Sequence, residues 1–201
     1  MSKIPLRILI LILTLLLQKS TFAESEHKIA ILVNEEMITT YEIVQRMKIN
    51  AILQGINLNS ENSQVFANSV AEELIQEKLK EEKINEYDIV ISDNDYKDHE
   101  LNFFQNLRFD KNVILNSLEE NNINYQEFKV FLGTQMAWQK LIGALYYRLT
   151  SASETEISDT MAKNPNLNKE QAENLVIQRQ LDLKSSKLLR DMLNEATIEY
   201  K

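Results

Sequence analysis

Residues 28–43 read KIAILVNEEMITTYEI, and this stretch decides how the chain folds. Lys28 to Val33 is rich in aliphatic and β-branched residues, which favour an extended strand. The polar triplet Asn34-Glu35-Glu36 is typical of a turn, and Met37 to Thr39 can return as a second short strand. A hairpin of this size is too small to be stable alone. We therefore expect a third strand or a helix to cover it.

The hairpin leads directly into a helix, because Thr39 carries the signature of a helix start. Thr39 precedes Glu42 by three residues, so the two can bond to each other's backbone in a capping box. Ile38 before the cap and Ile43 after it form the accompanying hydrophobic staple. Related signatures occur at Ser92 with Asp95, at Asn124 with Glu127 and, in weaker form, at Ser153 with Glu156.

Beyond these starts, the chain reads as a series of long helices. It has only three glycines and two prolines, far fewer than chains built from many strands and tight turns. Apolar residues spaced by threes and fours run from Phe128 to Leu145 and from Ile177 to Met192. We expect helices at residues 40–54, 63–83, 93–106, 111–120, 125–149, 154–162 and 169–194.

The β-prone tail from Ala196 to Tyr200 completes the predicted fold. This tail can supply the third strand that the N-terminal hairpin lacks, so that the two ends of the chain meet. The fold class that we predict is mainly α. One helical core is closed by a small β-sheet, formed by the N-terminal hairpin and the C-terminal strand.

The first residues predict export. An apolar run from Ile8 to Leu17 follows two positive charges, and the small residue Ala23 suits a signal peptidase site. The run is shorter than the roughly 20 residues that a membrane span needs, and no cysteine follows it to carry a lipid. We expect residues 1–23 to be a cleaved signal peptide. Residues 24–201 then form one domain in the periplasm, without stable membrane insertion.

Charge and composition exclude several classes of function. Removing residues 1–23 takes away three positive charges and no acid, which moves the net charge from −8 to −11. Such an acidic balance argues against nucleic acid as a partner, since phosphate binding needs concentrated lysine and arginine. With no cysteine, the chain can form no disulfide. Acidic pairs such as Glu72-Glu73 are typical of solvated helix faces.

The sequence holds no pattern that supports catalysis or metal binding. His27 and His99 are the only histidines, and neither has a partner at a metal-ligand spacing, so we expect both to be exposed. Three scattered glycines build neither a nucleotide-binding loop nor a nucleophile elbow. We therefore predict no metal, no cofactor and no enzymatic activity.

The stretch from Val33 to Ile43 (VNEEMITTYEI) resembles the opening of SurA-type periplasmic chaperones. Further stretches similar to that family follow in the same order: EELIQEKL at 72–79, ISD at 91–93, NYQEF at 124–128, QMAWQKLI at 135–142, LLRDML at 188–193 and IEYK at 198–201. None of these motifs is specific by itself. The ordered set covers nearly all of residues 24–201, and it is the set that carries the resemblance.

In that family, one or two parvulin-type prolyl isomerase domains lie between the N-terminal helices and the closing helix. Here only a short stretch around Asn164-Pro165 separates the N-terminal part, 24–163, from the closing helix and strand, 167–201. The resemblance implies an ATP-independent holdase that binds unfolded outer-membrane or other exported proteins. Two alternatives stay open. One is an adaptor tethered by an uncleaved N-terminal helix that binds one partner, and the other is a degenerate prolyl isomerase.

Six side chains are candidates for binding apolar client segments: Phe103, Phe104, Met136, Trp138, Tyr146 and Tyr147. Aromatic and methionine surfaces accept varied apolar sequences with modest geometric demands. Trp138 also follows the helical seam, which favours a place in the core. Neighbours on a helix point about 100° apart, so we expect one member of each adjacent aromatic pair at the surface.

Overall fold

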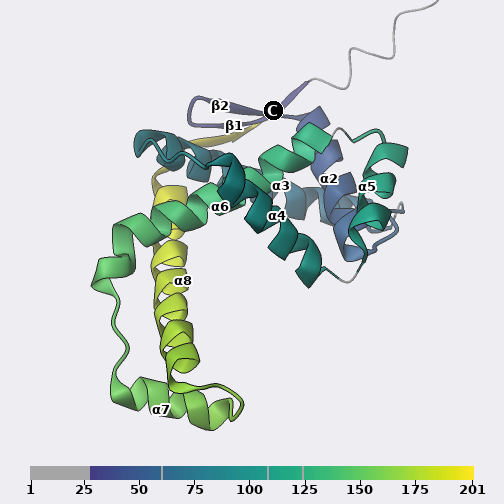
Figure 1. Cartoon of the computed structure of the whole chain (residues 1–201). Coiled ribbons are helices and arrows are strands. Elements are labelled where there is room, and N and C mark those ends of the chain that lie inside the picture. Colours follow the sequence, from purple (N-terminus) through teal and green to yellow (C-terminus); the bar gives the residue numbers. More distant parts are fainter. Residues whose placement is uncertain (1–27, 60, 108, 124) are drawn as a thin grey trace, which may run out of the picture.

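A three-stranded antiparallel sheet joins the two ends of the described chain (Figure 1). In the computed structural model, which describes residues 28–201 apart from 60, 108 and 124, β1 (Ile29–Val33) lies between β2 (Glu36–Thr39) and β3 (Ile198–Tyr200). The pairing of β1 with β3 confirms the prediction that the C-terminal tail supplies the third strand. β2 already begins at Glu36, since the turn consists of Asn34 and Glu35 alone.

Asn34 fixes the corner at which the two ends meet. Its φ of 53° lies in the left-handed region, which asparagine tolerates better than most residues. Its backbone N–H donates to the Thr197 carbonyl at 2.9 Å, and its side-chain oxygen accepts from the Thr197 N–H at 3.0 Å. The turn of the hairpin is therefore bonded to the residue that enters β3.

Seven α-helices and one 3-10 turn make up most of the described chain. They are α2 (Thr40–Gln54), α3 (Ser63–Glu86), α4 (Asp93–Asn106), α5 (Lys111–Glu120), α6 (Tyr125–Tyr146), η1 (Tyr147–Leu149), α7 (Glu154–Lys163) and α8 (Lys169–Glu195). The predicted helices are confirmed, with differences of at most three residues at their ends. α3 continues past residue 83 because Ile84 is buried, and residues 147–149 tighten into the 3-10 turn.

The cap of α2 forms as its sequence predicts. The Glu42 N–H donates to Thr39 Oγ1 at 3.1 Å, and the Thr39 N–H donates back to the Glu42 carboxylate at 2.7 Å. Other predicted starts differ in detail: Ser153 and Glu156 form a full capping box, Ser92 accepts from the Asp95 N–H alone, and Asn124 lies outside the described residues. An aspartate side chain is one carbon shorter than glutamate, which explains the one-sided cap of α4.

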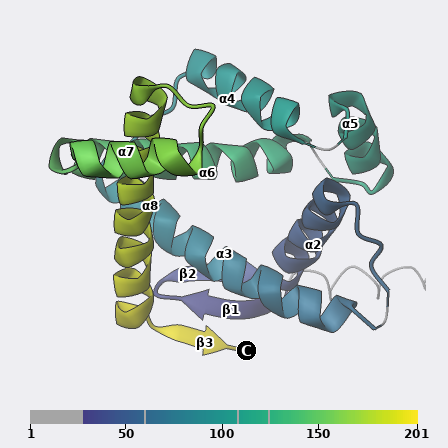
Figure 2. The same cartoon turned by 90° about the horizontal axis from the view of Figure 1, so that it is seen from below.

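Helix α3 is the centre of the packing (Figure 2). It lies against one face of the sheet, where Leu74 and Leu79 are buried with Ile31. α2, α6 and α8 each pack on α3 as well. Two further core clusters lie on α6, one around Phe128 with α4 and α5, and one around Leu141 with α8. The sheet, α3 and α6 therefore form a body to which the other helices attach.

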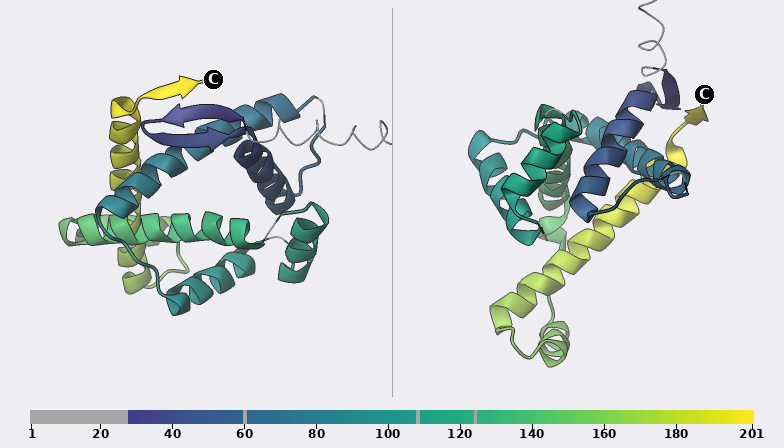
Figure 3. Two further views of the ribbon diagram at one scale, coloured as in Figure 1. Left: turned by 90° about the horizontal axis from the view of Figure 1, so that it is seen from above. Right: turned by 90° about the vertical axis from the view of Figure 1, so that its right-hand side faces the viewer.

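α7 and the N-terminal half of α8 project from this body as an arm (Figure 3). α7 packs on α8, and Ile157 and Val176 are buried there. The linker before α7 is tied to α8 by Gln180. Its side-chain oxygen accepts from the Ser151 N–H at 3.2 Å, and its amide nitrogen donates to the Ser151 carbonyl at 2.8 Å. Between α6 and α8 the described chain holds only η1, α7 and their connections, with no parvulin domain.

Among the described helices, none combines the length and the apolar character that crossing a membrane requires. The predicted signal peptide, residues 1–23, lies outside the residues that the structure describes. Its cleavage after Ala23 stays a prediction.

Candidate binding surfaces

The six side chains predicted to bind apolar segments divide between core and surface. Phe104 and Trp138 are only 7% and 6% exposed, which removes them from the accessible surface. Trp138 donates from Nε1 to Ser185 Oγ at 2.8 Å, so it joins α6 to α8 as a core residue. Tyr147 is 59% exposed. The other three, Phe103, Met136 and Tyr146, are partly buried.

The two adjacent aromatic pairs behave differently. Tyr147 is exposed and Tyr146 partly buried, as expected for neighbours that point apart on a helix. Neither phenylalanine of the other pair is exposed. The reason is that Phe103 packs edge-on against both Phe104 and Phe128, with ring centroids 5.6 and 5.9 Å away. Only the tyrosine pair therefore presents an exposed aromatic ring to a ligand.

A groove of about 560 Å³ that the sequence reasoning missed lies between the C-terminal end of α2 and α5. Its apolar lining includes Ile56 and Leu58 after α2, together with Phe109 and Val113 on the other side. Val113 is 53% exposed, and Ile56 and Leu58 are 37% and 36% exposed. The polar residues of the lining are Lys48, Asn57, Ser117 and Asn121. The one sequence feature that points to this groove is the pair Ile56 and Leu58, two apolar residues in a segment outside the helices and strands.

Gly55 shapes this groove because it lets the chain turn close to Phe109. Its φ of 66° places it in the left-handed region at the C-terminal end of α2. A Cβ atom at this position would lie 2.8 Å from the Phe109 ring, closer than two carbons can approach. Glycine at position 55 thus allows the left-handed turn and also leaves room for the Phe109 ring in the groove.

We expect Gly55→Ala to lower the free energy of unfolding by more than about 1 kcal/mol, since the left-handed conformation alone costs an alanine about that much. Displacement of the Phe109 ring adds to the loss. Gly133→Ala in α6 is the control, because a Cβ there meets nothing within 4 Å. It should instead stabilise the helix by roughly 0.5–1 kcal/mol. Urea unfolding measures both, and a shift in the same direction for both variants would contradict this account of Gly55.

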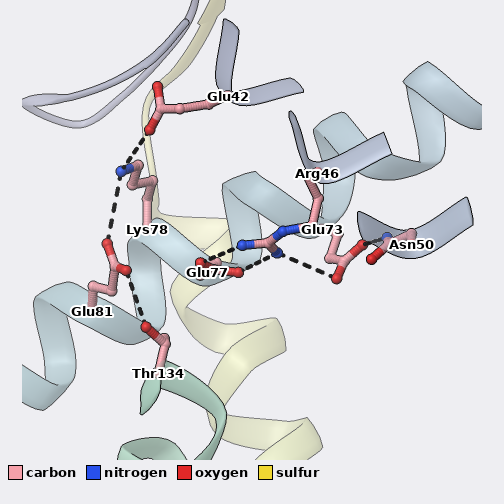
Figure 4. A network of polar contacts seen from close by, with 8 residues as sticks. All are labelled: Glu42, Arg46, Asn50, Glu73, Glu77, Lys78, Glu81 and Thr134. Carbon is pink, nitrogen blue, oxygen red and sulfur yellow. Dashed lines mark hydrogen bonds and ion pairs between the residues drawn. The ribbon is translucent and has the colours of Figure 1, made fainter. Parts of the chain in front are cut away.

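A buried ion-pair network holds α2, one wall of the groove, against α3 (Figure 4). Arg46 is 6% exposed, and its guanidinium donates to the Glu77 carboxylate through bonds of 2.5 and 2.7 Å. It also donates to Glu73 at 3.4 Å, and Glu73 accepts from the Asn50 amide at 2.6 Å. The guanidinium carbon lies 4.6 Å from the ring centroid of Phe131 on α6. Three helices therefore meet at one arginine.

Lys78 holds a second set of contacts, which joins α3 to α2 and α6 (Figure 4). Its Nζ lies 3.3 Å from the Glu42 carboxylate and 3.8 Å from that of Glu81, which accepts from the Thr134 hydroxyl of α6 at 3.2 Å. Burial raises the pKa of Glu81 above its ordinary value, with Lys78 acting against it. Burial also tends to raise the pKa of Glu42. The hydrogen bonds from Thr39 and the contact with Lys78 have the larger combined effect and hold this pKa below its ordinary value. Two cations thus face four carboxylates in these contacts, which join α2, α3 and α6.

Within the described residues, no group of three or more His, Cys, Asp or Glu side chains is placed to hold a metal ion. His99, which we expected to be exposed, is partly buried. It shares a face of α4 with Tyr96 and Phe103, at i−3 and i+4, and this face packs on the core. His27 lies outside the described residues.

Over most of its length the chain is similar to one protein family. The model of the family described as "SurA-like N-terminal domain" matches residues 1–142. Among solved structures, the chain is similar to one described with PEB4 and Cj1289, two structurally related SurA-like chaperones of Campylobacter jejuni. That match has 16% sequence identity and a TM-score of 0.45, and it covers 86% of this chain and 98% of that chain. Comparison with curated proteins gives no match.

Proposed function

Because the chain belongs to the SurA-like N-terminal domain family, we propose that it is a periplasmic chaperone that holds unfolded outer-membrane or other exported proteins without ATP. The observation that carries this proposal is the groove between α2 and α5, whose apolar side chains are left partly uncovered. Exposed apolar surface that accepts varied sequences is what a holdase requires. A groove of this kind needs no catalytic group.

The walls of the groove suit an extended polypeptide. Aliphatic side chains such as Val113 and Ile56 offer contact to apolar residues without demanding one fixed geometry. Asn57, Ser117 and Asn121 place amide and hydroxyl groups beside them, and these can bond to the main chain of an extended segment. Such a mixture recognises unfolded chains in general better than it recognises any one sequence.

The expected affinity of this groove is low. Covering the parts of Val113, Ile56 and Leu58 that are still exposed contributes on the order of 3 kcal/mol in total, from about 1.5–3 kcal/mol for a fully buried side chain of this size. Binding also costs the segment part of its freedom. One groove therefore gives a dissociation constant no tighter than roughly millimolar. Clients are then retained through several weak contacts and released without an energy source.

The proposed function is tested by the aggregation of a urea-unfolded outer-membrane porin that is diluted into buffer. Light scattering is followed with and without purified protein, produced as residues 24–201. Suppression of scattering at near-stoichiometric amounts, with no ATP present, is the expected result. If folded protein in large excess leaves the scattering unchanged, the chain is no holdase, and a search for one specific partner becomes the next step.

We expect Val113→Asp to weaken this suppression measurably, because it places a charge in the apolar part of one of the surfaces that retain clients. Val113 is 53% exposed, so the variant should remain folded. Val65→Asp is the matched control, since Val65 is 73% exposed on α3 and does not line the groove. Circular dichroism verifies folding of both variants. Equal suppression by the two would show that the groove between α2 and α5 is not where clients bind.

A further inference from the structure

Exposed apolar side chains lie on η1 and on the part of α8 that the residues flanking η1 contact. Tyr147 and Leu149 of η1 are 59% and 68% exposed, and Leu183 of α8 is 66% exposed. Leu183 stands at i+7 from Val176 and so shares its face of α8. Val176 is 3% exposed in the part of α8 on which α7 packs, whereas Leu183 lies uncovered further along.

Two contacts hold η1 beside Leu183. Before the turn, Tyr146 is held by Lys184, whose Nζ lies 5.6 Å from the ring centroid. After it, Ser151 is held by Gln180 through both of its backbone groups. Lys184 and Gln180 stand on either side of Leu183 along α8, so η1 between them lies next to that leucine. The residues on both sides of η1 thus contact the turn of α8 that carries Leu183.

Cations surround this surface. Arg148 lies within η1 and Lys184 follows Leu183, while Lys187 and Arg190 stand at i+4 and i+7 from Leu183 on the same face of α8. In the described part of the chain, Arg148, Lys184 and Arg190 form no ion pair, and Lys187 pairs only with an aspartate of its own helix. We call this surface the α8 patch: Tyr147, Arg148, Leu149, Leu183, Lys184, Lys187 and Arg190.

We propose that the α8 patch binds client segments in which apolar residues are flanked by acidic ones, an inference that rests on the proposed function. The exposed apolar side chains meet the apolar part of such a segment. The cations attract its acidic flanks and repel basic ones. The patch is therefore complementary in charge to a segment of one kind, on a chain whose net charge is −8.

The expected preference is about tenfold. A single exposed ion pair contributes little, but several cations act together on the flanks of one segment. Because Arg148, Lys187 and Arg190 are exposed, salt screens their charges and weakens the preference. Apolar contact with Leu183 does not depend on the charge of the flanking residues. Removing this contact should therefore weaken the binding of acidic-flanked and basic-flanked segments equally.

The test compares two fluorescently labelled peptides that share a central run of leucine, valine and tyrosine. One carries glutamates on both flanks and the other carries lysines. Fluorescence anisotropy with the purified protein should show about tenfold tighter binding of the glutamate-flanked peptide at low salt, and a smaller difference at high salt. Replacing Lys184, Lys187 and Arg190 together by glutamine should remove the preference. Leu183→Ser should weaken both peptides alike.

The matched control replaces three exposed lysines outside the patch by glutamine, namely Lys97, Lys163 and Lys169. It changes the net charge by the same amount as the patch variant and should keep the preference. Equal binding of both peptides by protein that still suppresses aggregation overturns this inference and leaves the proposed function standing. A patch variant that keeps the preference overturns it too.

Two further outcomes would give the patch another occupant. If the patch variant alters only binding to phosphatidylglycerol vesicles, the surface faces lipid. If it alters only the molar mass measured by light scattering, the surface joins two copies of the chain. Either result overturns the inference, while the aggregation assay decides separately whether the chain is a holdase.

Discussion

Replacing Arg46 with methionine is expected to lower the free energy of unfolding by about 3–5 kcal/mol. The guanidinium is the cation that Glu77 and Glu73 share across the interface between α2 and α3. Methionine fills much of the same volume, but it leaves the largely buried Glu77 carboxylate without its partner, whereas Glu73 keeps its bond from Asn50. Removing one side of a buried pair is far more costly than losing an exposed one, because the remaining charge stays out of water.

Urea unfolding followed by circular dichroism measures this loss. The control is Lys169→Met, which breaks the exposed pair with Glu154 and should cause no measurable change. Adding Glu77→Leu to Arg46→Met should recover part of the stability, since an apolar replacement of both partners removes the stranded charge. If Arg46→Met behaved like the Lys169 control, the network in Figure 4 would not hold α2 to α3.

The position of α2 also links this network to function. Arg46 and Lys48 lie on the same helix, and Lys48 lines the groove between α2 and α5, donating to the Asn121 carbonyl at 3.2 Å. Loss of the ion pairs weakens the hold of α3 on α2, which is one wall of the groove. Protein with Arg46→Met that remains folded should therefore suppress aggregation less well than the unchanged chain.

Local signals predicted most of the fold. The cap at Thr39 involves residues three apart, so its geometry depends on neighbours in the sequence and on nothing distant. The third strand followed from a physical need, because a short hairpin requires cover and the tail from Ala196 onward is β-prone. Helix ends were less certain. Whether α3 continues to Glu86 depends on the burial of Ile84, and burial depends on which helices pack there.

The candidate surfaces were harder to predict, because they join residues that are distant in the sequence. Phe109 approaches Gly55 only through the packing of α5 beside α2, and neither residue carries a motif. Periodicity placed Trp138 on an apolar seam, in agreement with its burial, but it said nothing of a groove elsewhere. The spacing of Lys187 and Arg190 after Leu183 is visible in the sequence. The proximity of η1 to this part of α8 depends on the bonds of Gln180 to Ser151, which the sequence does not reveal.

Phe128→Ala is expected to lower the free energy of unfolding by about 3–5 kcal/mol. Phe128 is 0% exposed, and four aromatic rings surround it with centroids 5.8 to 6.3 Å away: those of Phe103, Phe104, Tyr125 and Phe131. Truncation to alanine removes these contacts and leaves a cavity that rings from α4 and α6 cannot fill without moving. Phe128→Leu keeps part of the volume and should cost less than Phe128→Ala, although it also loses the ring contacts.

Tyr147→Ala separates stability from binding, because it removes a ring of similar size from the surface. Tyr147 is 59% exposed, so its loss should change the free energy of unfolding by less than about 0.5 kcal/mol. Both variants are compared by urea unfolding, and Tyr147→Ala is then tested in the aggregation assay. Weaker suppression at unchanged stability would assign Tyr147 to client binding, as the sequence predicted. Unchanged suppression would mean that the exposed ring of Tyr147 does not bind clients. Equal unfolding midpoints for Tyr147→Ala and Phe128→Ala would contradict the place of Phe128 in the core.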